Sequence, residues 1–162
     1  MRRVVVNTTP IIALANIGCL SLLHELYDEV IIPSAVNNEI ISEPARSLVD
    51  SRNWIKINNV TDDAWNRMVF STRLHAGEAE VIMLAKECGA DLLIIDDNAA
   101  KKTAKYLGMT VTGTMGVLLK AKREGYIVAV KPLLKSLIED GFYVSTAVRS
   151  YVMEQSGETW EG

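Results

Sequence analysis

The chain has 162 residues, of which 49% are hydrophobic and 23% charged, and its formal net charge is −3. That length and balance are ordinary for one soluble globular domain, and no apolar run approaches the roughly 20 residues of a membrane helix. Cys19 and Cys88 form neither a CxxC pair nor a zinc-binding spacing, which favours free thiols in a reducing compartment. We therefore predict a cytoplasmic protein without a membrane partner, with one domain over residues 1–156 and a frayed tail over 157–162.

Charge is segregated along the chain. Residues 1–100 carry eight Lys or Arg against 14 Asp or Glu, whereas residues 101–135 carry eight basic residues and one acidic residue. Such segregation can place a basic face, suited to a nucleic-acid backbone, beside an acidic site; a solvated helix face is the alternative. The candidate nucleic-acid contacts are Lys101, Lys102, Lys105, Lys120, Lys122 and Arg123.

Short apolar strands alternate with helices along most of the chain. Val4–Val6 is a buried type of strand, and it runs through Asn7 into a helix whose first turn holds Pro10. Further strands are predicted at 30–32, 54–60, 91–96 and 109–112. Further helices are predicted at 20–26, 34–41, 61–71, 78–87, 97–107, 114–124, 130–140 and 144–155, and residues 43–53 are irregular or weakly helical. This alternation predicts an α/β fold in which helices cover both faces of a mostly parallel sheet.

Polar side chains follow three of the predicted strands. They are Asn7, Thr8 and Thr9 after the first strand, Asp96 and Asp97 after the strand at 91–96, and Thr112 and Thr114 around the end of the strand at 109–112. Ligands of parallel sheets bind at the carboxyl ends of the strands, so we predict a site at this edge. The structural alternative is that Asp96, Asp97 or Thr114 only caps the helix that follows it.

Two predicted helices bring further carboxylates toward the core. At about 100° per residue, Glu78 lies within the apolar stripe of its helix, whereas Glu80 is predicted to face the opposite, polar side. Glu39 lies at the edge of the apolar stripe of the helix at 34–41. Helix capping by Glu78 and a surface position for Glu39 are the alternatives. If Glu39, Glu78 and Asp96 converge near Asn7, their mutual repulsion requires a cation, and an all-oxygen acidic set suits Mg²⁺ or Mn²⁺.

Four segments together resemble a known family. They are VVVNTTPIIALANIG, VNNEI, HAGEAEVIMLAKECGADLLIIDDNAAKKTAKYLG and VTGTMGVLLKAKREG, and the similarity covers residues 3–155. In their order and spacing they resemble the PIN-like proteins, in the branch known as uncharacterised predicted nucleic-acid-binding proteins. The resemblance implies a three-layer sandwich, with a central parallel sheet of four or five strands between helices. It also implies Mg²⁺- or Mn²⁺-dependent cleavage of RNA, as in the toxin ribonucleases of toxin–antitoxin pairs, with a homodimer and a small antitoxin as expected partners.

The resemblance also implies which residues form the site. The acidic positions of the family fall on Asn7, Glu39, Glu78 and Asp96 as metal ligands, with Asp97 as an alternative one residue along. Its hydroxyl falls on Thr9, with Thr8 as the alternative, so the expected catalytic residues are Glu39, Glu78, Asp96 and Thr9. Thr114 stands where the family often has a further polar residue. From the residues alone, His75, two positions before Gly77, is a candidate base or phosphate contact.

Asn7 departs from the family pattern, which has an aspartate after the first strand. An amide oxygen still ligates Mg²⁺, but it brings no charge and cannot act as a base. Reduced metal affinity and slow or absent catalysis are therefore expected. The alternative function is a PIN-like domain that binds RNA or a protein partner without cleavage. A nucleotide-binding α/β domain is a third hypothesis, weakened by the lack of a Gly-rich loop after the first strand.

Overall fold

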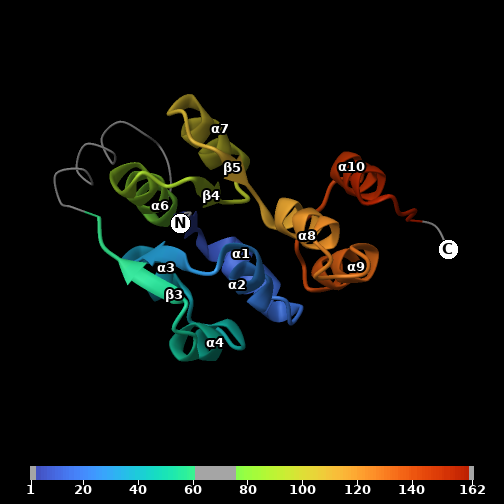
Figure 1. The fold of residues 1–162 in the computed structure, drawn as a ribbon, viewed down its shortest axis with the longest axis horizontal. Helices are drawn as coiled ribbons and strands as arrows, with labels where there is room; N and C mark the ends of the chain where they lie inside the picture. The colour runs from blue at the N-terminus through green and yellow to red at the C-terminus, as the bar shows by residue number, and fades with distance from the viewer. Residues whose placement is uncertain (1–2, 61–75, 161–162) are drawn as a thin grey trace.

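The computed structural model describes residues 3–60 and 76–160, and a five-stranded sheet forms its centre (Figure 1). The strands are β1 (Val4–Val6), β2 (Val30–Pro33), β3 (Ile55–Asn58), β4 (Leu92–Ile94) and β5 (Val111–Thr112). Their order is β3-β2-β1-β4-β5, and every adjacent pair is parallel. The predicted parallel α/β sheet is therefore confirmed.

Helices cover the sheet in two groups. The helices are α1 (Thr8–Asn16), α2 (Ser21–Tyr27), α3 (Ser34–Glu39), α4 (Ala45–Ser51), α6 (Ala76–Cys88), α7 (Asn98–Tyr106), α8 (Thr114–Arg123), α9 (Lys131–Glu139) and α10 (Thr146–Ser156). Helix α6 packs on β1, β2 and β4 beside α7, whereas α8 contacts α1 and α2. Because parallel crossovers are right-handed, the change of direction along the sheet puts these groups on opposite faces. Figure 1 shows α8, α9 and α10 gathered at one end of the molecule.

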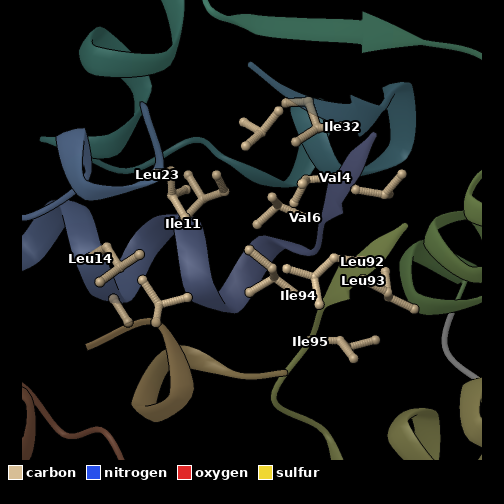
Figure 2. Close-up of a cluster of buried hydrophobic side chains, with 14 of the residues drawn as sticks. Val4, Val6, Ile11, Leu14, Leu23, Ile32, Leu92, Leu93, Ile94 and Ile95 are labelled. Carbon is tan, nitrogen blue, oxygen red and sulfur yellow. The ribbon is translucent and has the colours of Figure 1, made fainter. Parts of the chain in front are cut away.

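The strands are short, and their side chains are almost completely buried. Val4, Val5 and Val6 of β1 are all 0% exposed, because β1 lies in the middle of the sheet with helices on both faces. Figure 2 shows side chains of β1, β2 and β4 gathered with Ile11, Leu14 and Leu23 from α1 and α2. Each such side chain contributes about 1.5–3 kcal/mol on burial, so the core fixes the strand ends firmly. These ends carry the polar residues of the candidate site.

The structure differs from the predicted elements at residues 45–51 and at the start of the tail. Residues 45–51 form a regular helix, α4, within the stretch 43–53 for which the sequence predicts irregular or weakly helical structure. The start of the predicted tail is also ordered, because Glu158 and Trp160 both pack against the domain. The predicted helix at 61–71 and His75 lie outside the described residues.

Cys19 and Cys88 are free thiols. No single helix within residues 3–60 and 76–160 is long and apolar enough to cross a membrane. Helices α1 and α2 reach the length and hydropathy of a membrane span only when taken together, and the chain bends by 116° between them.

Candidate metal and nucleic-acid site

Asn7 lies at the carboxyl edge of the sheet, next to the segment that ends in Asp96. Its backbone N–H donates to the carbonyl oxygen of Ile94 at 2.9 Å, which extends the pairing of Val6 with Ile94 by one step. The Asn7 side chain is 5% exposed, and among the described residues only Thr114 is another buried polar side chain. Position 7 is therefore a buried polar position at the carboxyl edge of the sheet.

Thr114, the first residue of α8, holds the Asp96 carboxylate. The backbone N–H of Thr114 donates to Oδ1 at 2.8 Å, and its hydroxyl donates to Oδ2 at 2.7 Å. Asp96 therefore caps the start of α8, although each of its oxygens keeps a second lone pair for another ligand. Gly113 permits this approach, since a Cβ there would lie 2.5 Å from Oδ1 of Asp96 and 3.0 Å from Nζ of Lys101.

Asp97 caps helix α7 and so differs in its role from its neighbour Asp96. Its side chain accepts a hydrogen bond from the backbone N–H of Ala100 at 2.8 Å, which is the N-cap of α7. Asp97 is exposed, whereas Asp96 is half-buried and lines a cavity. Of the two neighbouring candidates, Asp96 has the position that suits a ligand site.

The hydroxyl that reaches a candidate carboxylate belongs to Thr8. Oγ1 of Thr8 donates to Oε2 of Glu39 at 3.0 Å and so joins the start of α1 to the end of α3. Thr9 is exposed and lines a separate cavity of about 200 Å³ between α1 and α9. The structure thus favours Thr8, the alternative, over Thr9 as the partner of Glu39.

Arg46 on α4 holds the end of α3 that carries Glu39. Its guanidinium donates to the carbonyl oxygens of Asn37 and Ile40, both at 2.7 Å. It also forms a close ion pair with Asp50, one turn along α4, at 2.6 Å. The unexpected helix α4 therefore satisfies carbonyl groups that the short helix α3 leaves free at its end.

Glu80 corrects the analysis of helix faces. It was predicted to face the polar side of its helix, but it is partly buried and accepts a hydrogen bond from the backbone N–H of Ala35 on α3. Burial raises the pKa of Glu80, and the negative charge of Glu39 raises it further. Glu78 is half-buried in the first turn of α6. Glu39 and Glu80 thus form a carboxylate pair across α3 and α6, and the sequence analysis missed its second member.

The predicted basic contacts separate into four groups. Lys102 and Lys105 are exposed on α7, and Lys101 and Arg123 line a cavity of about 410 Å³ that also contains Asp96. Nζ of Lys120 lies 4.7 Å from the ring centroid of Tyr27. Nζ of Lys122 donates to the Glu158 carboxylate at 2.9 Å and to the carbonyl oxygen of Ser156 at 2.6 Å. Lys122 is thus occupied by contacts within the protein.

The donor atoms fit a hard divalent cation in type. Oxygen atoms of Asn7, Glu39, Glu78, Glu80 and Asp96 are the ligands that Mg²⁺ and Mn²⁺ prefer. Within the described parts of the chain, no three His, Cys, Asp or Glu side chains stand close enough to hold one ion together. The carboxylates fall into two groups, Asp96 near β5 and Glu39 with Glu80 near α3, and Asn7 and Thr8 connect them along the chain.

The fold and this site define an α/β domain with an oxygen-rich, largely acidic set of residues at the carboxyl edge of a parallel sheet. Residues 3–158 match the sequence profile of the PIN domain family, and the chain belongs to that family. PIN domains generally bind RNA, depend on divalent metal ions and are associated with nuclease activity. A search of curated proteins found no sequence that matches the chain significantly.

Proposed function

We propose that this protein is a Mg²⁺- or Mn²⁺-dependent ribonuclease that cleaves single-stranded RNA at the carboxyl edge of its sheet. The observation that carries the proposal is the Asp96 carboxylate, fixed by two hydrogen bonds from Thr114, in a cavity that also holds Lys101 and Arg123. A fixed carboxylate suits a divalent ion, and neighbouring cations suit the phosphates of a nucleic-acid backbone. The general properties of the PIN family agree with this combination.

Each side chain has a defined part in the proposal. Asn7, Glu39, Glu78 and Asp96 would hold one or two metal ions between them, and Glu80 would add a carboxylate beside Glu39. When bound, Mg²⁺ or Mn²⁺ supplies positive charge to phosphate oxygens and lowers the pKa of a bound water. Two hydroxyl groups keep the carboxylates in position, since Thr8 donates to Glu39 and Thr114 to Asp96.

The experiment that tests the proposal is cleavage of an end-labelled single-stranded RNA in Mn²⁺ by the wild type, Asp96→Asn and Asp97→Asn. Asp96→Asn should lower the rate by about 100-fold, because it removes a fixed charge from the reacting site. Asp97→Asn is the matched control, since an asparagine caps a helix as well as an aspartate does. Cleavage that survives EDTA, or that Asp96→Asn leaves intact, would show that this site is not the nuclease centre.

One observation favours a second function, binding of RNA or a protein partner without cleavage. Position 7 holds a neutral amide that is 5% exposed, where a nuclease of this family has a carboxylate. The variant Asn7→Asp separates the two functions. Faster Mn²⁺-dependent cleavage in Asn7→Asp than in the wild type supports a weakened nuclease. Bound RNA with no cleavage in either protein supports the binding function.

The proposal includes a cellular setting, that of the toxin of a toxin–antitoxin pair acting as a homodimer. Co-expression with the product of the neighbouring small reading frame tests the antitoxin, because a cognate partner should co-purify and inhibit cleavage. Light scattering tests the dimer. A monomer at the concentrations used for cleavage, or cleavage unaffected by the neighbouring product, would remove the corresponding part of the proposal.

A further inference from the structure

We infer that the cavity between α8 and α10 is a subsite for one unpaired nucleotide of the RNA, with the ring of Tyr151 stacking on the base. The inference rests on the proposed function and extends it to a part of the chain outside the acidic residues. The cavity measures about 410 Å³, which is within the range of small-molecule sites, about 300–1,000 Å³. It adjoins the proposed reacting centre because Asp96 is one of its lining residues.

One wall of the cavity is apolar and comes from two neighbouring helices. Helix α8 contributes Met115 and Leu119, which are one turn apart, and α10 contributes Val148 and Tyr151, which are three residues apart and share a face. Helices α8 and α10 are in direct contact. Val148 is 42% exposed and Tyr151 is 58% exposed, although both are large apolar side chains. An exposed aromatic ring on the wall of a cavity is the surface on which a nucleic-acid base stacks.

The cations of the cavity point to an anionic ligand. Lys101 and Arg123 both line it, from α7 and from the end of α8. Lys122, next to Arg123 in the chain, is excluded because it binds Glu158. A ligand that combines a flat aromatic group with a phosphate satisfies the tyrosine and the two cations together. A nucleotide of the substrate strand has this chemistry.

The second large cavity provides a comparison. It measures about 200 Å³, lies between α1 and α9, and has no Lys or Arg among its described lining residues. Asp140 is its one charged lining residue. An anionic strand is therefore expected at the cavity beside α10 and not at the cavity beside α9.

The nucleotide in this subsite must be unpaired. A base in a duplex stacks on its neighbours along the strand, and only a base turned out of the helix offers a face to a side chain. The subsite therefore selects single-stranded RNA, and Tyr151 is a positioning residue that holds the strand next to Asp96.

The test is fluorescence anisotropy in EDTA, with a short labelled single-stranded RNA and the same sequence as a duplex. Tyr151→Ala should weaken binding of the single strand by about tenfold, the order expected for loss of one stacked base. Tyr151→Phe keeps the ring and should bind as the wild type does. Tyr143→Ala is the matched control, because Tyr143 is 86% exposed and lies outside the cavity lining. Affinity for the duplex should stay unchanged in all three variants.

A second variant covers the case in which Tyr151→Ala does not fold. Val148→Glu keeps Tyr151 and adds a negative charge at an exposed position of the same wall, so it should also weaken single-strand binding. Wild-type affinity in Tyr151→Ala or Val148→Glu, or an equal loss for single strand and duplex, overturns the subsite. If Asp96-dependent cleavage persists in that case, only the subsite fails. If the wild type does not cleave but Tyr151 still controls binding, only the nuclease fails, and a wild type that binds no RNA refutes both.

Discussion

Glu158 fastens the end of α10 to the start of α9 and to α8. Its carboxylate accepts hydrogen bonds from the backbone N–H groups of Val130 at 2.8 Å and Lys131 at 2.9 Å, and from Nζ of Lys122 at 2.9 Å. Burial alone would raise the pKa of Glu158, but the hydrogen bonds lower it from 4.5 to about 2. The variant Glu158→Gln keeps the shape of the side chain and removes its charge.

The magnitude follows from the change in pKa. One pKa unit corresponds to about 1.4 kcal/mol, so the lowering of the Glu158 pKa corresponds to about 3 kcal/mol of stability. The side chain keeps 14% exposure to solvent, which screens the interaction and reduces the expected loss to about 2 kcal/mol. Because the folded pKa is depressed, the contribution is complete above the unfolded pKa of about 4.5 and disappears as the pH falls toward about 2.

Urea unfolding followed by circular dichroism measures this loss. At about pH 7, Glu158→Gln should unfold with about 2 kcal/mol less free energy and melt about 4–8 °C lower than the wild type. The gap should shrink below about pH 4 and vanish as the pH falls past about 2, where the wild-type carboxylate also becomes protonated. Glu154→Gln is the control, since Glu154 is an exposed glutamate on α10, four residues before Glu158. An unchanged midpoint at neutral pH, or a gap that does not vary with pH, would refute the assignment of the clamp.

Three further substitutions test how the site is supported. Lys122→Ala removes the partner of Glu158, so it should lower the urea midpoint at neutral pH and leave RNA affinity within about twofold of wild type. A large loss of affinity would show that Lys122 contacts the RNA. Gly113→Ala places a Cβ 2.5 Å from Oδ1 of Asp96, so Mn²⁺-dependent cleavage should fall at least about tenfold, and an unchanged rate would contradict the geometry. Arg46→Ala removes the donors that hold the end of α3, so it should cost about 2 kcal/mol in urea unfolding and slow cleavage through Glu39, and full stability would contradict the role given to α4.

The edge of the sheet was predictable because it depends on local patterns. Val4–Val6 is an apolar run that ends abruptly at Asn7, and residues 92–95 form an apolar run that ends at Asp96. Once both are parallel strands, their carboxyl ends must lie at one edge, and the pairing of Val6 with Ile94 confirms the fold on which this depends. Whether Glu39, Glu78 and Asp96 share an ion stays a prediction.

Choices between neighbouring residues were not predictable, because they depend on packing. Thr8 and Thr9 both follow β1, and only the position of α3 shows that Thr8 reaches Glu39. The helical angle predicted that Glu80 faces the polar side of α6, but α3 covers part of this face and the backbone N–H of Ala35 binds the carboxylate. A helical wheel contains no information about which other helix covers a face.

Contacts between segments far apart in the chain were the hardest feature to predict from the sequence. Lys122 belongs to the basic segment 101–135, and the charge of that segment favoured a nucleic-acid contact for it. Its partner Glu158 is 36 positions away, in a segment whose glycines and polar residues predicted fraying. The backbone N–H groups at the start of α9 donate hydrogen bonds to that carboxylate, and the carboxylate also binds Nζ of Lys122.

The burial of Asn7 gives its substitution a physical meaning. A carboxylate that is 5% exposed would lose most of its hydration, and it would need a cation or several donors to stay charged. Glu39 is exposed and Asp96 is half-buried, so both keep more contact with solvent than position 7 does. The amide at position 7 has no charge to bury, whereas Asn7→Asp should fold less stably in EDTA and regain stability in Mn²⁺ by about 2.7 kcal/mol at 100 times the dissociation constant. Equal thermal shifts of the wild type and Asn7→Asp in Mn²⁺ would show that position 7 does not touch the ion.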